Sequence, residues 1–525
     1  MENTNTIKYL KTYLWQGAAF LLRFLSLFIV TPYLTKDPTT YGIYAVCLSV
    51  TVFLGYADLG FLQAGQKYAA ECYTRGERAE EMRYIGFGTF ILLVFTLLCA
   101  AVFCYLGYHP QVLIKGLDTP IKVSTASNLL FILAAFAPVT VLQRMVAMIF
   151  AIRLEAYINQ RISLFASILT IVSVFYLFGG GNYRIVPYFF FFQTFNFIAV
   201  VVSLWIAKKK YEYNIQQLFR YVSFNSDIYK KAEGLAYSGL YLMFVWIVFY
   251  ELDQMAIGKY LGAEKVAIFS IAFTFAVLFR SIYGVLFFPF TVQANHFVGK
   301  GDDAGLKRFC LQLVTLSAPL VVIPTVALAL VAKPFILSWV GVKYTDSVPL
   351  ARLFSLVFMS SFIGYTASMI FTAKVQLKEM CLIATIQPII YWPGILATYS
   401  VLGLLSFASF KLAAVFISDV YCFYLLTRFF NMSVKELFKK TIYPLLGPLV
   451  FLVAALLTAN RYLPCEKSRI NLLIVLVTAG MCISVSMGIQ YLASSDIQIA
   501  AKSILRSIFP KKLTAEIRGA VIKTI

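Results

Sequence analysis

Long apolar segments separated by short polar ones run along the whole chain. Most of the apolar segments lack the alternation of a β-strand, and few are as short as the roughly ten residues that a membrane-spanning strand needs. At about 20 residues for each helical span, the pattern predicts an all-α polytopic membrane protein with about 14 transmembrane helices. The predicted spans are residues 13–34, 41–63, 84–107, 126–151, 162–178, 185–207, 236–257, 263–289, 309–332, 349–373, 380–402, 406–427, 442–459 and 470–493.

The composition supports the same class of protein. Hydrophobic residues make up 60% of the 525 residues and charged residues only 13%, whereas an average soluble protein has about 25% charged residues. So few charges could not cover the surface of a soluble protein. The high hydrophobic content also excludes a disordered chain.

The net charge is +21, from 45 Lys and Arg residues against 24 Asp and Glu residues. In a membrane protein this excess indicates contact with anionic membrane lipids and the positive-inside rule, so we expect no nucleic-acid partner. If the N-terminus is cytoplasmic, the cytoplasmic segments hold 29 of the 45 basic residues. The bias predicts that both termini face the cytoplasm.

The spacing of the apolar segments predicts five parts of the chain. The longest polar segment begins with three consecutive lysines and resembles a linker between two halves of six spans each. The predicted parts are a six-helix bundle at 1–210, a cytoplasmic linker at 211–235, a second six-helix bundle at 236–432, two further helices at 433–495 and a basic amphipathic tail at 496–525.

Short sequence matches recur in the same order on the two sides of this linker. Tyr33-Leu34 before the second span is matched by Tyr260-Leu261 before the eighth, and Arg75-Gly76-Glu77 by Lys300-Gly301-Asp302. Because six spans is an even number, the two halves would be parallel repeats, an arrangement of transporters whose site lies between the halves near the midplane. Chance similarity between apolar helices is the alternative.

Charged residues inside the spans are the main candidates for function. A charge at the bilayer centre costs at least about 2.5–3.5 kcal/mol, so it usually faces a cavity or a partner. Arginines there favour a substrate with phosphate groups, since the guanidinium fork binds two phosphate oxygens at once; a transporter of organic cations would need carboxylates. The candidate substrate-binding residues are Arg23, Arg144, Arg280, Arg352 and Lys411, and the candidate ion-coupling residues are Asp58, Asp253 and Asp419.

Structural alternatives accompany these assignments. Arg352 and Lys411 lie near the start of their spans, where long side chains can snorkel to the lipid headgroups. Arg23 and Arg280 lie deep in their spans, where the alternative to substrate binding is a structural ion pair. Asp58 and Asp419 could take up a coupling proton or neutralise a cavity arginine, and the sequence leaves both roles open. For Asp253 the alternative is an ion pair with Lys259 or exposure at the membrane interface.

Enzyme and metal-site motifs are missing from the sequence. It has no H-E-x-x-H and no G-x-S-x-G motif, and Gly299-Lys300-Gly301 lacks the spacing of a phosphate-binding P-loop. The nine cysteines form no C-x-x-C pair, and His109 and His296 fall in predicted loops. We therefore expect a protein that is not an enzyme and that uses no cofactor and no metal.

Three stretches of the chain resemble one family of membrane proteins. Each motif is loose by itself, but their order and spacing are more specific, and the likeness covers nearly the whole chain. The stretches are Thr31-Pro32-Tyr33-Leu34 followed by Tyr41-Gly42-Ile43-Tyr44 and Tyr56-Ala57-Asp58-Leu59-Gly60; Asp253-Gln254-Met255-Ala256-Ile257-Gly258-Lys259-Tyr260-Leu261-Gly262; and Lys333-Pro334-Phe335-Ile336-Leu337 with Gly341-Val342-Lys343-Tyr344.

With these motifs the chain resembles the Wzx-type flippases of polysaccharide and O-antigen repeat units, in the MOP (multidrug/oligosaccharidyl-lipid/polysaccharide) exporter superfamily. The resemblance implies a V-shaped pair of six-helix bundles that alternates access across the bacterial inner membrane. It implies a lipid-linked oligosaccharide on undecaprenyl diphosphate as substrate, held by its headgroup in a cationic cavity. Arg23, Arg144 and Arg280 suit that role by position. A polysaccharide polymerase and a chain-length regulator are the protein partners that the resemblance suggests.

Other functions compete with this interpretation. Another MOP transporter, such as a flippase of lipid II or a teichoic-acid precursor, is the nearest alternative, and a drug antiporter fits less well with the arginines. An integral-membrane polymerase or ligase would need a sizeable periplasmic loop, and none is predicted. A non-transporting assembly scaffold is also compatible with the sequence.

Overall fold

The computed structural model describes residues 2–508, and every regular element in that range is a helix. Thirteen helical segments of the described residues are long and apolar enough to cross a membrane, and some of them, such as Pro38–Gly55, join two consecutive short helices. A bent pair, α14 (Ser347–Leu356) and α15 (Ser361–Ala373), adds a fourteenth span if its two helices, inclined by 46°, cross together. The predicted all-α polytopic membrane protein is confirmed.

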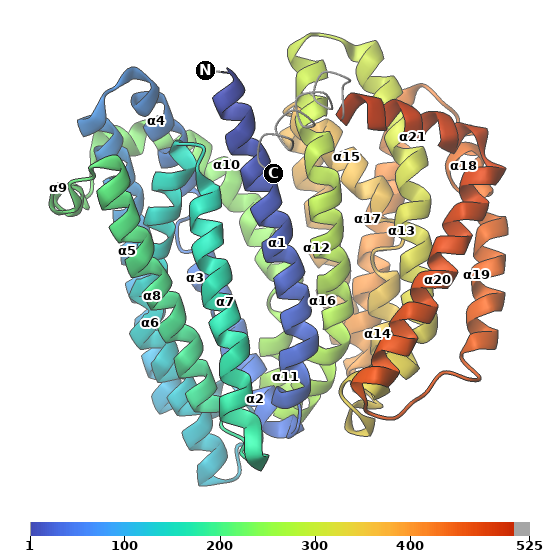
Figure 1. Ribbon diagram of the computed structural model, residues 1–525, viewed down its shortest axis with the longest axis horizontal. Coiled ribbons are helices and arrows are strands. Elements are labelled where there is room, and N and C mark those ends of the chain that lie inside the picture. Colours follow the sequence, from blue (N-terminus) through green and yellow to red (C-terminus); the bar gives the residue numbers. More distant parts are fainter. Residues whose placement is uncertain (1, 509–525) are drawn as a thin grey trace, which may run out of the picture. The chain divides into compact units, whose positions relative to one another are not determined.

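The chain forms two compact units, Met1–Ala267 and Ile268–Ile525. The predicted division into six-helix bundles, a linker and two further helices stays a prediction. The first unit contains α1 (Glu2–Leu34), α2 (Pro38–Ser49), α3 (Val52–Gly55), α4 (Phe61–Arg75), α5 (Arg78–Tyr108), α6 (Pro120–Ile152), α7 (Ala156–Phe178), α8 (Ile185–Tyr211), α9 (Ile215–Arg220), α10 (Ser226–Tyr250) and α11 (Asp253–Leu261), with short 3-10 turns at Pro110–Val112 and Gly179–Gly181 (Figure 1).

The second unit is built around one long helix. This helix, α13 (Asp303–Trp339), is buried over most of its length and packs against α14, α15, α19, α20 and α21. It continues through Pro319, Pro324 and Pro334, which membrane helices tolerate because neighbouring groups satisfy the freed carbonyls. The other helices are α12 (Ala263–Gly299), which begins in the first unit, α16 (Leu377–Leu402), α17 (Leu405–Phe430), α18 (Val434–Thr441), α19 (Leu446–Ala459), α20 (Arg469–Ala493) and α21 (Ser495–Ile508), with 3-10 turns at Val342–Tyr344 and Tyr443–Leu445.

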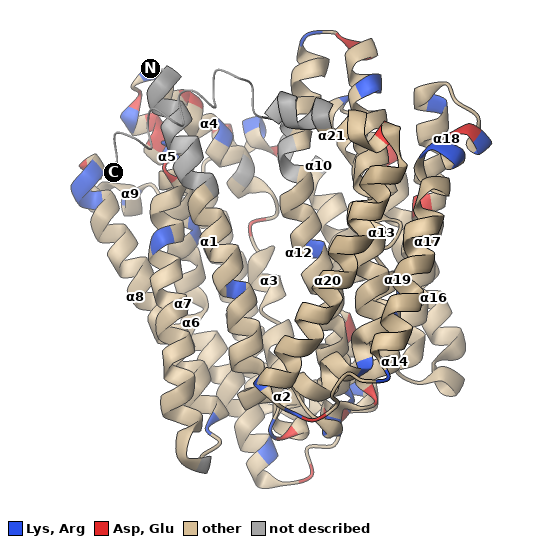
Figure 2. Ribbon diagram, turned by 45° about the vertical axis from the view of Figure 1, so that its right-hand side comes forward, with Lys and Arg blue, Asp and Glu red and all other residues tan. Residues whose placement is uncertain are grey.

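Charged residues gather at the ends of the helices and in their connections, and the middle portions are largely apolar (Figure 2). In α5, for example, all four charged residues fall within the first six positions, 78–83, and the remaining residues carry no charge. The helical backbone satisfies its own hydrogen bonds, so apolar side chains can face lipid along the middle of each helix. This is why the apolar pattern located the spans.

Three predicted spans are interrupted, which corrects the expectation of one continuous helix in each. The span predicted at 41–63 consists of α2 and α3, followed by a turn at residues 56–60 before α4 begins. The span predicted at 236–257 breaks between α10 and α11, and the span predicted at 349–373 breaks between α14 and α15. Each break releases backbone groups from helical hydrogen bonding, so polar partners must lie nearby.

One pair of matched sequence segments forms the same turn in both units. Gly76 and Gly301 have left-handed backbone conformations, with φ of 77° and 69°. The amide after each glycine donates to the carbonyl five residues earlier, from Glu77 to Cys72 and from Asp302 to Phe297, both at 3.0 Å. This is the Schellman ending of a helix, in which glycine avoids the steric cost of the left-handed region.

The predicted amphipathic tail begins as the helix α21. Ile497 and Ala500, which are 5% and 1% exposed, are buried on the side where α21 packs against α13 and α20. The side chains of Lys502 and Arg506, and the remaining predicted tail at 509–525, lie outside the residues that the structure describes.

Candidate functional site

Asp58 and Arg144 form an ion pair at the break in the second span. Arg144 Nη1 donates to Asp58 Oδ1 at 2.9 Å, and Nη2 donates to the carbonyl oxygen of Gly55, the last residue of α3. The guanidinium therefore satisfies both a buried carboxylate and a carbonyl that the break releases. The Asp58 side chain is 5% exposed and that of Arg144 is 30% exposed, so Arg144 remains partly accessible.

The turn that holds Asp58 depends on an unusual backbone conformation. Leu59 and Gly60 are both left-handed, with φ of 48° and 80°. The amide of Phe61 donates to the carbonyl of Asp58 at 2.9 Å, which closes the turn before α4. A Cβ atom at Gly60 would lie 3.0 Å from the carbonyl oxygen of Ala236. The turn, and with it the position of Asp58, therefore requires glycine at residue 60.

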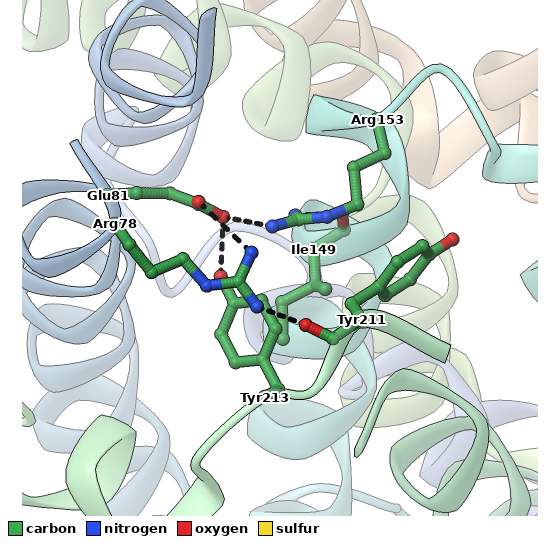
Figure 3. Close-up of polar contacts among 6 residues, drawn as sticks. All are labelled: Arg78, Glu81, Ile149, Arg153, Tyr211 and Tyr213. Atoms are coloured by element: carbon green, nitrogen blue, oxygen red, sulfur yellow. Dashed lines mark hydrogen bonds and ion pairs between the residues drawn. The ribbon is translucent and has the colours of Figure 1, made fainter. Parts of the chain in front are cut away.

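A second ionic cluster joins the start of α5 to the end of α6 (Figure 3). Arg153 Nη2 donates to Glu81 Oε1 at 2.7 Å, and these side chains are only 2% and 1% exposed. The hydroxyl of Tyr213 donates to the same carboxylate oxygen at 2.6 Å, and Arg78 Nη1 lies 3.7 Å from Oε2. Arg153 Nη1 donates to the carbonyl of Ile149 at 3.0 Å. Glu81 Oε1 thus accepts two hydrogen bonds, and the Arg78 guanidinium places positive charge beside Oε2.

Aromatic rings enclose the Arg153 guanidinium. Its Cζ atom lies 4.6 Å from the ring centroid of Tyr73, 4.9 Å from that of Tyr211 and 5.1 Å from that of Tyr213. Cation–π contacts of this kind are stronger when they are desolvated. Burial, followed by the charge of Glu81, raises the pKa of the Tyr213 hydroxyl, which keeps it protonated as a donor to the carboxylate.

Glu155 extends this cluster to the end of α8. Its Oε2 accepts hydrogen bonds from the Lys210 ammonium and from the Tyr211 hydroxyl. Arg78 Nη2 donates to the backbone carbonyl of Tyr211 at 2.5 Å. Three segments that the sequence predicts to be cytoplasmic loops are therefore connected by ion pairs. We call the ionic residues of this cluster, which are Arg78, Glu81, Arg153, Glu155 and Lys210, the loop clasp.

The sequence analysis missed the loop clasp because it considered only charges inside the predicted spans. The available signal was acidic residues beside the ends of spans on a side that is otherwise rich in basic residues. Glu81 precedes the third predicted span by three positions, and Glu155 follows the fourth by four. An acidic side chain among basic ones is expected to form an ion pair with one of them, which suggests a structural role.

In the second unit, Asp419 of α17 lies against the break between α14 and α15. The hydroxyl of Ser360, the residue before α15, donates to Asp419 Oδ2 at 2.6 Å. Asp419 is 5% exposed. A Cβ atom at Gly364 would lie 2.3 Å from Asp419 Oδ1, so the carboxylate occupies space that only glycine leaves free. Interrupted spans thus hold all three predicted ion-coupling aspartates, Asp58 and Asp253 in the first unit and Asp419 against the break in the second.

We expect Gly364→Ala to displace the Asp419 carboxylate and to break its hydrogen bond to Ser360. The expected loss of stability is about 1–3 kcal/mol, as for overpacked positions, measured by denaturant unfolding of the purified protein. Gly284→Ala in α12 is the control, because a Cβ atom there meets nothing within 4 Å and alanine favours the helix. Equal stability of Gly364→Ala and wild type would contradict the placement of Asp419.

Arg280 lies near the middle of α12 and is half-buried. The hydroxyl of Tyr365 is within electrostatic range of both the Arg280 guanidinium and the Asp419 carboxylate. The Tyr365 ring stacks on that of Phe287, with centroids 5.0 Å apart, and lies 6.4 Å from that of Tyr283. Helices α12, α15 and α17 therefore bring a predicted substrate-binding cation and a predicted ion-coupling anion to one tyrosine.

Lys411 and Arg352 occupy different surroundings. Lys411 is 1% exposed, and its Nζ atom lies 4.6 Å from the ring centroid of Tyr391 and 5.1 Å from that of Phe273. This burial differs from the snorkelling alternative, in which the ammonium would reach the headgroups. Arg352 is exposed on α14.

Arg23 and Asp253 complete the set of predicted site residues. Arg23 is exposed at the centre of the apolar part of α1, Leu14–Leu34. Among the residues that the structure describes, it forms no ion pair and no hydrogen bond. Asp253 is 1% exposed in the first turn of α11, where the positive end of the helix dipole stabilises a carboxylate.

Comparison of the sequence with known proteins gives a limited match. No family model matches the chain. The uncharacterized membrane protein EpsK of Bacillus subtilis (strain 168) is 28% identical over 127 residues, which are 23% of this chain and 25% of EpsK. The chain thus aligns with a quarter of the length of that relative.

Comparison with solved structures gives matches that cover most of the chain. The lipid II flippase MurJ, in an inward closed conformation, superimposes with a TM-score of 0.64 and 14% identity over 91% of this chain and 98% of MurJ. An inward-facing multidrug resistance MATE family transporter of the MOP superfamily superimposes with a TM-score of 0.58 and 15% sequence identity. The match covers 80% of this chain and all of that transporter. An outward-facing MATE family transporter of the MOP superfamily superimposes with a TM-score of 0.52 and 13% sequence identity, over 81% of this chain and 97% of that one.

These similarities show the fold alone, because the sequence identities are low. The chain is a multi-pass membrane protein with the fold of MOP superfamily transporters. The resemblance is therefore supported for the fold, and membership of the superfamily stays a prediction. The finer resemblance to Wzx-type flippases stays a prediction.

Proposed function

We propose that the protein is a flippase that moves lipid-linked oligosaccharides on undecaprenyl diphosphate across the bacterial inner membrane by alternating access, with both termini in the cytoplasm. It does so without an enzymatic step. The observation that carries the proposal is the position of Arg23, an exposed guanidinium at the centre of a membrane-spanning helix. The name of MurJ, a lipid II flippase with the same fold, supports a lipid-linked substrate.

Arg23 favours an anionic substrate for an energetic reason. A guanidinium that faced hydrocarbon would cost at least about 2.5–3.5 kcal/mol, so this surface of α1 must border water or a polar ligand. A diphosphate supplies oxygens for the guanidinium fork. The lipid chain can remain in the hydrocarbon of the bilayer while the headgroup crosses, so only the headgroup needs a polar path. Arg144 and Arg280, both partly accessible, supply further cations inside predicted spans.

Ion coupling is assigned to the aspartates, and Asp419 is the best candidate among them. Asp58 is already paired with the Arg144 guanidinium, which donates to it at 2.9 Å. Asp419 accepts a hydrogen bond from the neutral hydroxyl of Ser360, so a proton or cation can be exchanged there at lower cost. We expect Asp419→Asn to abolish transport driven by an ion gradient. Intact flipping after alanine substitution of Asp58, Asp253 and Asp419 together would refute ion coupling at these residues.

Complementation of a polysaccharide-negative strain that lacks its own flippase tests the proposal. Wild type should restore surface polysaccharide, and Arg23→Ala should reduce it at least tenfold at matched membrane levels, since a charge-assisted hydrogen bond contributes about 1.5–3 kcal/mol. Arg161→Ala is the control, because Arg161 is an exposed arginine near the start of α7. The lipid-linked units should accumulate on the cytoplasmic face in Arg23→Ala cells.

The outcomes separate the competing functions. Full activity of Arg23→Ala would make this arginine structural and would remove the main argument for an anionic substrate. Failure of well-expressed wild type with several sugar repeat units, together with resistance to cationic drugs, would favour a drug antiporter. Surface polymer that is lost without any accumulation of lipid-linked units on the cytoplasmic face would favour a polymerase or an assembly scaffold.

A further inference from the structure

The second unit contains a pocket that the proposed function does not use. It has a volume of about 200 Å³ and lies where the start of α13 meets α18 and α21. Its charged and polar lining comes from Arg308, Gln312 and Thr315 of α13, Lys440 of α18 and Asp496 of α21. Ile499 of α21 adds an apolar wall. The pocket is therefore assembled from the core helix of the unit and two short helices.

The two cations of this pocket are available to a ligand. Arg308 is exposed and Lys440 is half-buried. Among the described residues neither side chain forms an ion pair, although Arg308 Nε donates to the carbonyl of Ala304 at 3.4 Å. Asp496 offsets part of this positive charge. Two cations against one carboxylate leave a local excess that favours an anion.

The helix α18 shows that this end of the unit suits a membrane surface. Leu437 is fully buried, whereas Val434 and Phe438, on a neighbouring side of the helix, are 56% and 47% exposed. Lys435 and Lys439 are exposed beside them. Exposed apolar side chains together with lysines are the pattern of a helix that lies in the headgroup region, with its apolar side toward the acyl chains.

We propose that this pocket binds the headgroup of an anionic phospholipid, with the phosphate between Arg308 and Lys440 and the glycerol end against Ile499. The exposed apolar residues of α18 would contact the acyl chains. The volume suits a phosphate with a small polar group and is too small for a saccharide of several rings. None of the lining residues belongs to the proposed substrate-binding or ion-coupling set, so the proposal does not depend on the proposed function.

Segment 509–525 of the chain is a poorer occupant. It contains Lys511, Lys512, Arg518 and Lys523 against a single acidic residue, Glu516. A segment of the same sign as the two pocket cations would be repelled, whereas a phosphate would be attracted.

The test uses the full-length protein in nanodiscs of phosphatidylcholine, with and without phosphatidylglycerol. The readouts are the thermal unfolding temperature and the number of phosphatidylglycerol molecules retained in native mass spectrometry. Wild type should retain phosphatidylglycerol and be stabilised by it. Arg308→Gln/Lys440→Gln should bind it at least tenfold more weakly, and Lys440→Gln alone should show an intermediate loss.

Charge-matched variants distinguish lipid binding in this pocket from attraction of anionic lipid by the overall positive charge of the protein. Lys300→Gln/Lys378→Gln removes the same charge from exposed positions outside both the pocket and α18, and we expect it to bind like wild type. Asp496→Asn should bind several-fold more tightly, because it removes the one anion of the pocket, whereas Glu436→Gln, an exposed acidic residue of α18, should change little.

Three results would overturn the proposal. Equal loss of binding in the pocket and control variants would show that only the overall charge matters. Equal retention in wild type and the pocket double variant would place the lipid elsewhere. If inorganic phosphate raised the thermal unfolding temperature as much as phosphatidylglycerol does, the site would be assigned to a free anion instead of a lipid.

Discussion

Arg153→Met is expected to destabilise the protein by about 3–5 kcal/mol, because it leaves the Glu81 carboxylate buried without its main partner. Both side chains are almost inaccessible, at 2% and 1% exposure. A buried charge without compensation is far more costly than a missing surface contact. The measurement is the free energy of unfolding of the purified protein, with hydrogen exchange at the start of α5 and the end of α6 as the local readout.

A nearby exposed ion pair supplies the matched control. Arg83 and Glu80 of α5 are separated by 2.6 Å, which is similar to the Arg153–Glu81 distance, but their side chains are 49% and 44% exposed. Arg83→Met should therefore cost less than about 1 kcal/mol. Glu81→Leu combined with Arg153→Met should recover much of the lost stability, since an apolar pair can replace a buried ion pair. Similar effects of Arg83→Met and Arg153→Met would contradict the burial of the clasp.

The loop clasp has a consequence for the first unit. Its ion pairs join residues 72 positions apart in Glu81 and Arg153, and 55 apart in Glu155 and Lys210. Contacts of this range fix the ends of α5, α6 and α8 to one another. Because the clasp lies outside the apolar portions, it can hold these helix ends without placing further charge inside the membrane.

The sequence predicted the membrane-spanning helices well, because apolar length is a local property. A run of about 20 apolar residues satisfies the membrane by itself. The three interruptions were not predicted, since residues such as Tyr56 and Leu252 are compatible with a continuous helix. The turn at residues 56–60 depends on Arg144, which lies 89 positions from Gly55. Such a partner is known only once the helices are packed.

The candidate site shows the same limit. Hydropathy singled out Asp58, Arg144, Arg280 and Asp419 as charges inside spans, and this depends only on local sequence. The pairing of Asp58 with Arg144 and the position of Asp419 against Ser360 arise from tertiary structure. The sequence therefore identified which residues need an explanation, and the structure supplied their immediate surroundings.

Arg280→Ala is expected to raise the half-saturating concentration of lipid-linked substrate about 10- to 100-fold, if the proposed function is correct. A charge-assisted hydrogen bond contributes about 1.5–3 kcal/mol, and each 1.4 kcal/mol changes affinity tenfold. The measurement is flipping of lipid-linked oligosaccharide by the protein in liposomes. Arg280→Lys should be intermediate, because an ammonium keeps the charge but loses the planar fork that binds two phosphate oxygens.

The alternative for Arg280 is a structural ion pair with Asp419, and the two roles give different results. Lys265→Ala, which removes an exposed cation from the same helix, should leave both transport and stability unchanged. If Arg280 binds substrate, Arg280→Ala should lose affinity while its unfolding temperature stays close to that of wild type. If Arg280 instead neutralises Asp419, Arg280→Ala should unfold more easily, and the added change Asp419→Asn should restore stability, since the second substitution removes the carboxylate that has lost its partner.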